Sequence, residues 1–361
     1  MQFCRLPAVN RHVRTAIQNY NAEPMILFLA KRFTGLILLL VALSTLVFFF
    51  TRSLPGDVAA LYIGGNAKPE QIERARIELG LDKPLVVQYK RYMERLIFHA
   101  DMGVSLRTHR PVFQDLLEKI PMSFELVFWA LLFATLGGVF IGVISAYHHG
   151  TPFDGAVKWF TSAAVSIPIF FLALLLQLIF FNILGWFPLQ GRIDSFLEFT
   201  HPIAHVTGFS MIDTLITGNF QAFFNVLWHM VLPVAALLVG PLGIIARLTR
   251  SSLLEVMQQD FILSARASGI SEPVLFFYYG LRNALSPVLT VIGLSVALIL
   301  MATFYVEMIF NWPGIGFYAL AGIMSLDYPA ITGIALMVGA IYVVANTLTD
   351  ILRRVIDPRI K

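Results

Sequence analysis

Apolar residues in this chain are gathered into long blocks that alternate with polar segments. Each block is near the roughly 20 residues that cross about 30 Å of hydrocarbon as a helix. The alternation of barrel strands is absent, and backbone groups in lipid must bond within their own segment. The pattern therefore predicts an all-α integral membrane protein with six spans, at residues 33–50, 123–147, 159–184, 226–245, 285–306 and 331–352.

The long polar segment after the first span, residues 51–122, is expected to lie outside the membrane. Helical spacing of apolar residues predicts short helices over 69–79, 84–99 and 111–120, each with proline near its start, where a helix tolerates it. Its near-balanced charge favours a solvated cap over direct substrate contact.

The polar segments divide the chain around a membrane-spanning core. The divisions are an N-terminal segment 1–32, the first span 33–50, the outer loop domain 51–122, a core 123–352 that contains the loop 246–284, and a tail 353–361. Met25 opens a more typical start than Met1, so translation from either residue stays open. The first apolar block begins too late and is too long for an ordinary cleaved signal, so it is expected to remain as a span.

Composition supports a membrane protein and argues against a nucleic-acid partner. Only 13% of the 361 residues are charged and 57% are hydrophobic, whereas soluble domains carry about 25% charged residues. The net charge of +4 reflects basic residues in the flanks of the spans rather than one cluster. By the positive-inside rule these flanks place both termini and the loop 246–284 in the cytoplasm, while a long loop such as 51–122 crosses regardless of charge. The single cysteine, Cys4, permits neither an internal disulfide nor a paired-thiol metal site.

Small residues and prolines in the spans predict how the helices pack. Gly138, Gly142 and Ala146 are spaced four apart, which lets another helix approach closely in lipid. Prolines lie within or at the edges of several spans, where kinks are expected: Pro168, Pro233, Pro241 and Pro287.

The chain lacks the common catalytic motifs. It contains no GxxxxGK[ST] phosphate loop, no HExxH and no GxSxG, so it is not expected to be an enzyme by itself, and it has no recognisable site to bind and hydrolyse ATP. The span interiors are nearly free of ionisable residues. Glu125 and His229 near the outer helix ends and Asp350 near an inner end are expected to be solvated there. A proton-coupled secondary transporter is expected to bury a carboxylate, so that class is the weaker alternative, together with a channel or scaffold.

One cytoplasmic segment stands out, Asp260-Phe-Ile-Leu-Ser-Ala-Arg-Ala-Ser-Gly269-Ile-Ser-Glu272. Asp260 is suited to cap a helix start and Gly269 to end it, which predicts about two turns. Ala265 and Ala267 allow close approach to a groove, and Phe261 and Arg266 are suited to anchor the helix there. An amphipathic helix on the membrane surface explains the same residues equally well.

Several motifs match one family in order along the chain. They are Leu54-Pro-Gly-Asp57, Leu79-Gly-Leu-Asp-Lys-Pro-Leu85, Met102-Gly-Val-Ser-Leu106, Ser264 to Gly269, Leu281-Arg-Asn-Ala-Leu285, Phe310-Asn-Trp-Pro-Gly-Ile-Gly316 and Asp357-Pro-Arg359. The 260–272 segment resembles the "EAA" coupling loop of binding-protein-dependent ABC importer permeases, in particular the dipeptide/oligopeptide/nickel subfamily. Leu263-Ser264-Ala265 departs from the usual Glu-Ala-Ala, and Tyr279-Gly280 from the common His-Ala.

The resemblance implies a type I ABC importer fold in the bacterial inner membrane. Its implied partners are a second related permease subunit, two ATPase subunits that hold ATP and Mg, and an extracytoplasmic solute-binding protein, with no cofactor in this chain. The resemblance implies that one set of residues couples this chain to the ATPases: Ser264, Ala265, Arg266, Ala267, Gly269 and Glu272. Asp260 and Phe261, at the start of the same helix, are assigned to the same coupling site. Trp312, Pro313 and Gly314 are candidates for an outer gate or receptor contact, with a tight turn between spans as the alternative.

The spans do not identify the substrate. The subfamily handles di- and oligopeptides, glutathione, metal chelates such as nickel complexes, opines and some oligosaccharides. Specificity is expected to reside mainly in the separate binding protein.

Overall fold

The computed structural model describes residues 25–53, 59–60, 68–78, 81–204 and 206–356. The alternative start at Met1 and the tail motif 357–359 lie outside these ranges. Within them the chain folds into helices, with one isolated bridge between Val104 and Pro111. The prediction of an all-α membrane protein is confirmed.

Among the described residues, five helices are long and apolar enough to cross a membrane. They are α2 (Met25–Ser53), α6 (Val112–Tyr147), α11 (Phe220–Val256), α14 (Leu281–Ile309) and α16 (Tyr328–Ile356). Each matches a predicted span, although α6 and α11 extend well beyond it. α11 continues through Pro233 and Pro241, and α14 through Pro287.

The third predicted span, 159–184, is not one helix. α7 (Pro152–Ser166) is followed by α8 (Ile169–Leu176) and the π-helical segment η1 (Gln177–Ile183), and the two halves meet at 106°. Ile167 has the extended backbone that a residue before proline prefers, and Pro168 then begins α8. The predicted span is therefore present as a bent pair of helices, and the kink expected at Pro168 is confirmed.

The outer segment forms two of the three predicted helices. α4 (Pro69–Glu78) and α5 (Leu85–His99) are confirmed, whereas the predicted 111–120 helix is the first part of α6, which runs on through Pro121. Four further short helices in the described part of the chain were not predicted: α9 (Ser195–Thr200), α10 (Ser210–Ile216), α13 (Glu272–Val274) and α15 (Ile315–Met324).

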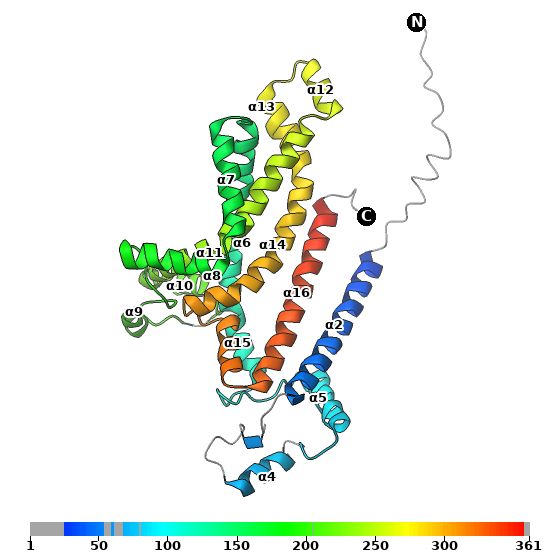
Figure 1. Cartoon of the computed structure of the whole chain (residues 1–361), viewed down its shortest axis with the longest axis vertical. Helices are drawn as coiled ribbons and strands as arrows, with labels where there is room; N and C mark the ends of the chain where they lie inside the picture. Colours follow the sequence, from blue (N-terminus) through cyan, green and yellow to red (C-terminus); the bar gives the residue numbers. More distant parts are fainter. Residues whose placement is uncertain (1–24, 54–58, 61–67, 79–80, 205, 357–361) are drawn as a thin grey trace, which may run out of the picture.

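The core of the bundle is the pair α6 and α11, which lie in close contact. A Cβ placed at Gly142 would be 2.6 Å from the Ala246 carbonyl oxygen, and one at Gly138 would be 2.8 Å from Ile245. The small-residue prediction is therefore confirmed: these glycines let the two backbones approach. On the other side of the bundle α2 lies beside α16, and Arg32 forms an ion pair with Asp350 there (Figure 1).

The two ends of the bundle carry different elements (Figure 1). The turn from α6 to α7, the short helix α12 (Asp260–Ala267), the start of α2 and the end of α16 lie toward one end. α4, α5 and α15 lie toward the other. This separation matches the predicted division of loops between the two sides of a membrane.

Replacing Gly142 by alanine is predicted to destabilise the protein by about 1–3 kcal/mol, because the added methyl group overpacks the α6–α11 contact. Gly155→Ala is the matched control, since Gly155 is also helical and its Cβ would meet nothing within 4 Å. Thermal unfolding of the purified protein in detergent measures both. Equal melting temperatures for the two variants would contradict the close contact.

Candidate functional site

The predicted two-turn helix exists as α12, between α11 and α14 at one end of the bundle. Asp260 is its first helical residue, whereas Gln259 occupies the cap position and its side chain makes no capping bond. The predicted cap at Asp260 is therefore wrong by one position. The Asp260 carboxylate still lies in the first turn, where it interacts favourably with the partial positive charge of the helix N-terminus.

Gly269 ends α12 as predicted. Its φ of +82° lies in the left-handed region, and its N–H donates to the Arg266 carbonyl at 3.0 Å. The Ile270 N–H donates to the Ala265 carbonyl at 3.3 Å, so the two bonds form a Schellman motif. Only glycine adopts this backbone without strain.

The sides of α12 differ in burial. Ile262 is fully buried, while the neighbouring Phe261 and Leu263 keep 40% and 49% of their surface exposed. Ser264 and Ala267 are exposed and Ala265 is half-buried. Two large apolar side chains and a small-residue surface thus remain uncovered within the chain.

Arg266 pairs within the loop. Its guanidinium donates two hydrogen bonds to the Glu272 carboxylate, one of them from Nη2 to Oε2 at 3.1 Å, and these bonds raise the pKa of Arg266. Glu272 begins α13 (Glu272–Val274), so the ion pair connects the two short helices across the Gly269 turn.

Beneath α12 the chain is held by η2 (Leu275–Gly280), a second π-helical segment. A Cβ at Gly280 would lie 2.9 Å from the Met257 sulfur, so η2 packs tightly on the end of α11. The rings of Phe276 and Phe277 also contact Tyr147 at the end of α6. α12 therefore rests on the same α6–α11 pair that forms the core.

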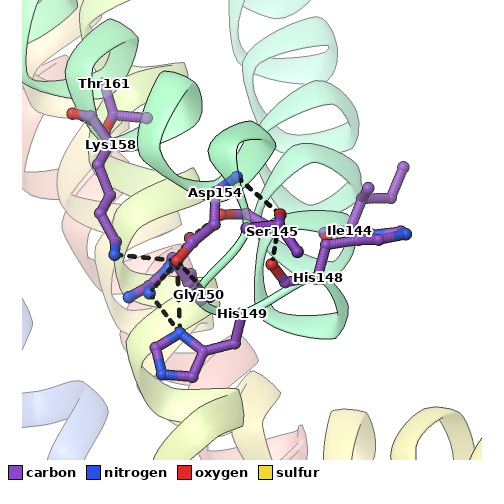
Figure 2. Close-up of polar contacts among 10 residues, drawn as sticks. Ile144, Ser145, His148, His149, Gly150, Asp154, Lys158 and Thr161 are labelled. Carbon is purple, nitrogen blue, oxygen red and sulfur yellow. Dashed lines mark hydrogen bonds and ion pairs between the residues drawn. The ribbon is translucent and has the colours of Figure 1, made fainter.

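A buried ionic cluster lies at this end of the bundle, centred on Asp154 (Figure 2). Its carboxylate is fully buried and accepts bonds from Arg250 Nε at 2.6 Å and Nη2 at 2.8 Å, in bidentate geometry. Ser145 Oγ donates at 2.7 Å and Lys158 Nζ lies 2.9 Å away. Arg250 Nη2 also lies 3.0 Å from His149 Nδ1, which must accept because a guanidinium has only donors. The cluster joins α6, α7 and α11.

The opposite end contains the turn predicted as an outer gate or receptor contact. Trp312 is fully buried and its indole N–H donates to the Met122 carbonyl at 3.0 Å. Pro313 is half-buried, and a Cβ on Gly314 would clash with Glu307 and Ser123. The turn therefore packs against the start of the second span.

Glu307 fixes the start of α15 at this turn. Its buried carboxylate accepts the backbone N–H of Gly316 at 2.7 Å and of Phe317 at 3.2 Å, two donors that a helix start leaves without a partner. The Ser123 hydroxyl accepts the N–H of Ile315 at 2.8 Å. α6, α14 and α15 are thus joined by polar groups that water does not reach.

Comparison with known families covers nearly all of the described chain. Residues 138–361 match the binding-protein-dependent transport system inner membrane component family, and residues 25–127 match its N-terminal family, described as a binding-protein-dependent transport system membrane component. The chain belongs to this family. It is accordingly a multi-pass inner-membrane protein of a transport system that depends on a binding protein.

Curated relatives match along almost their whole length. A probable D,D-dipeptide transport system permease protein of Escherichia coli K12 is 40% identical over 92% of this chain and 96% of its own. A dipeptide transport system permease protein of Alkalihalophilus pseudofirmus is 38% identical over 93% and 100%. The dipeptide permease protein of E. coli K12 is 35% identical over 93% and 99%.

Five buried acids of this permease were not anticipated from the sequence: Asp115, Asp154, Asp213, Glu307 and Asp327. A local sequence pattern could have indicated that Asp154 lies at a helix start, because Thr151-Pro-Phe-Asp154 is typical of a capped helix start with proline in its first turn. Glu307 lies one residue beyond the predicted end of the fifth span.

The expected solvation of the helix-end residues is also wrong for Glu125. Its side chain is only 3% exposed, and it accepts the Met211 N–H at 2.7 Å. Among the described residues, no group of three histidine, cysteine, aspartate or glutamate side chains is placed to hold a metal ion.

Glu307→Ala is predicted to destabilise the outer end, because each buried N–H left without a partner costs about 1–3 kcal/mol. The control is Glu198→Ala, which removes an exposed carboxylate and should change the free energy of unfolding by less than about 0.5 kcal/mol. Thermal melting in detergent reports both. An unchanged melting temperature for Glu307→Ala would show that α15 does not need this anchor.

Proposed function

We propose that this chain is the permease subunit of an ATP-driven importer for dipeptides or closely related peptides. Three relatives that match over nearly their full length are named as dipeptide transport permeases, and this supports a peptide substrate. The observation that carries the ATP-driven part is α12, a short helix fixed at both ends and exposing Phe261 and Leu263 at one end of the bundle.

The proposed partner of α12 is a groove on an ATPase subunit. Apolar side chains beside small residues suit helix-in-groove docking, and α12 presents Phe261 and Leu263 next to Ser264 and Ala267. The Arg266–Glu272 pair would keep α13 aligned with α12 during docking. Two ATPase subunits, a second permease subunit and an extracytoplasmic binding protein complete the proposed complex, with ATP and Mg held by the ATPases.

In the proposed mechanism the ATPases close around ATP and displace α12. Because α12 rests on the α6–α11 pair, its displacement shifts the bundle between inward-open and outward-open states. No ATP chemistry takes place in this chain. The residues of this chain receive the displacement of α12 and form half of the translocation path for the substrate.

The end that carries α12 is proposed to face the cytoplasm. Lys31, Arg32, Lys158, Arg247 and Arg250 lie in helix segments toward this end, and basic residues near span ends are retained on the cytoplasmic side. The Trp312 turn then faces outward. Because Trp312 is buried, its proposed role is to support an outer gate from within rather than to touch a receptor directly.

ATP-dependent uptake of a labelled dipeptide into proteoliposomes tests this function. The complete importer and its binding protein are expected to accumulate a dipeptide and not a nickel chelate of similar size. Accumulation of the chelate alone would overturn the peptide assignment, and uptake without ATP would overturn the ATP-driven mechanism.

Substitutions in α12 are predicted to uncouple the complex. Gly269→Pro is incompatible with a φ of +82°, and Ala265→Trp adds bulk to the small-residue surface. Both variants should insert normally and retain ATP hydrolysis while peptide uptake is lost. Ser271→Ala, an exposed change in the same loop, is the control. Uptake equal to that of the control would contradict the coupling role of α12.

A further inference from the structure

α7 is attached to α11 at three successive levels. Nearest the bend at Pro168, a Cβ on Gly243 would lie 3.1 Å from Ala164 Cβ and from the Thr161 carbonyl oxygen. One turn further on, Arg247 donates to the Thr161 carbonyl at 3.2 Å. At the end of the bundle, Arg250 makes its bidentate bond to Asp154 (Figure 2).

The attachment through Asp154 differs from the other two because it is ionic and its carboxylate is fully buried, although Arg250 and Lys158 keep 15% and 52% of their side-chain surface exposed. A buried carboxylate is tolerated only when its charge is compensated in good geometry. Here Arg250 directs two donors at it, Lys158 and Ser145 one each, and the Gly150 N–H adds a fifth bond at 3.2 Å. A bidentate guanidinium–carboxylate pair fixes orientation as well as distance. The Asp154 cluster therefore opposes rotation of α7 relative to α11 as well as separation of the two helices.

The positions of Arg250 and Asp154 in the chain determine how a movement of α12 would reach α7. Arg250 lies on α11 ten residues before Asp260, where α12 begins, and α11 continues unbroken to Val256. On the other side, α7 ends at Ser166 and its continuation departs at 106°. A displacement at α12 thus reaches Arg250 across the short turn 257–259 and then along α11. α7, by contrast, could move separately at its bend if nothing attached it to α11.

We infer that the Asp154 cluster fastens α7 to α11, so that α7 moves as one unit with the helix that carries α12. Asp154 and Arg250 are then positioning residues for ATP-driven transport, and the Ile167–Pro168 break is the point at which the unit turns relative to α8. This inference rests on the proposed function, because it assumes that α12 receives the motion.

A disulfide between α7 and α11 tests the inference without disturbing the cluster. Ala164→Cys with Gly243→Cys, in a Cys4→Ser background, places two sulfurs at a contact whose 3.1 Å Cβ separation needs a few tenths of an ångström of relaxation to reach disulfide geometry. The complete importer in proteoliposomes is measured for uptake and ATP hydrolysis after oxidation and again after reduction. Each single-cysteine variant is a control.

If α7 and α11 move together, oxidation leaves uptake per ATP unchanged relative to the reduced sample. Loss of uptake on oxidation that reduction restores would show that the two helices must separate, which overturns the inference. A pair that stays reduced in the assembled complex would contradict the close contact on which it depends.

Removing the charge tests the cluster itself. Asp154→Asn is expected to lower uptake per ATP hydrolysed by roughly two- to thirtyfold, and oxidation of the Ala164→Cys/Gly243→Cys pair in the same chain should restore it. Asp194→Asn, a carboxylate near the opposite end that caps α9, is the matched control. A purely structural role for Asp154 would reduce the yield of complex but leave uptake per ATP in the remaining complex unchanged, and that result would overturn the inference.

Measurements on the unmodified complex distinguish a failure of the proposed function from a failure of the inference about α7. If it shows no ATP-dependent peptide uptake, the proposed function fails whatever the variants do. If it transports peptide and neither the disulfide nor Asp154→Asn behaves as expected, the fastening of α7 alone is wrong.

Discussion

The close approach of α6 and α11 is the constraint on which the rest of this structure depends. Gly138 and Gly142 remove the side chains that would hold the two helices apart. Because the hydrophobic effect does not drive helices together in lipid, tight van der Waals contact between such small residues takes its place. α7 follows α6 directly in the chain, and α12 follows α11, so the positions of α7 and α12 depend on how α6 and α11 pack.

Polar groups fix the geometry at the two ends of the pair, where packing alone leaves helices free to slide. Asp154 lies in the first turn of α7, and Glu307 binds the free N–H groups at the start of α15. Glu307 is stabilised by the unpaired N–H donors of a helix start, whereas Asp154 is compensated mainly by the side chains of Arg250 and Lys158. Buried carboxylates at these places orient helices, which is a different role from the proton relay that a buried acid in a membrane protein usually suggests.

α12 combines a rigid attachment with an uncovered surface. Its base is held by Ile262, by the Schellman motif at Gly269 and by the aromatic contacts of η2 with α6. Phe261 and Leu263 remain exposed at the same place. An element held in this way would pass the displacement that the proposed ATPase docking causes on to α6 and α11.

The amino-acid sequence alone determined the membrane class, the approximate positions of the spans, the small-residue contact of α6 and the two-turn helix with its glycine end. These features depend on local composition and periodicity, because the bilayer and the helix impose fixed lengths and spacings on any chain. The family resemblance, carried by ordered motifs, was also readable without coordinates.

Only the tertiary structure decided the features that depend on distant residues. Asp154 meets Arg250, 96 positions away in the chain, and Ser105 meets Asp327, 222 positions away. The 106° bend at Pro168 and the burial of Glu125 and Trp312 likewise follow from what packs against them. A local pattern marks where a helix can break or a charge can lie, but which groups compensate that charge is set by the packing of helices that are far apart in sequence.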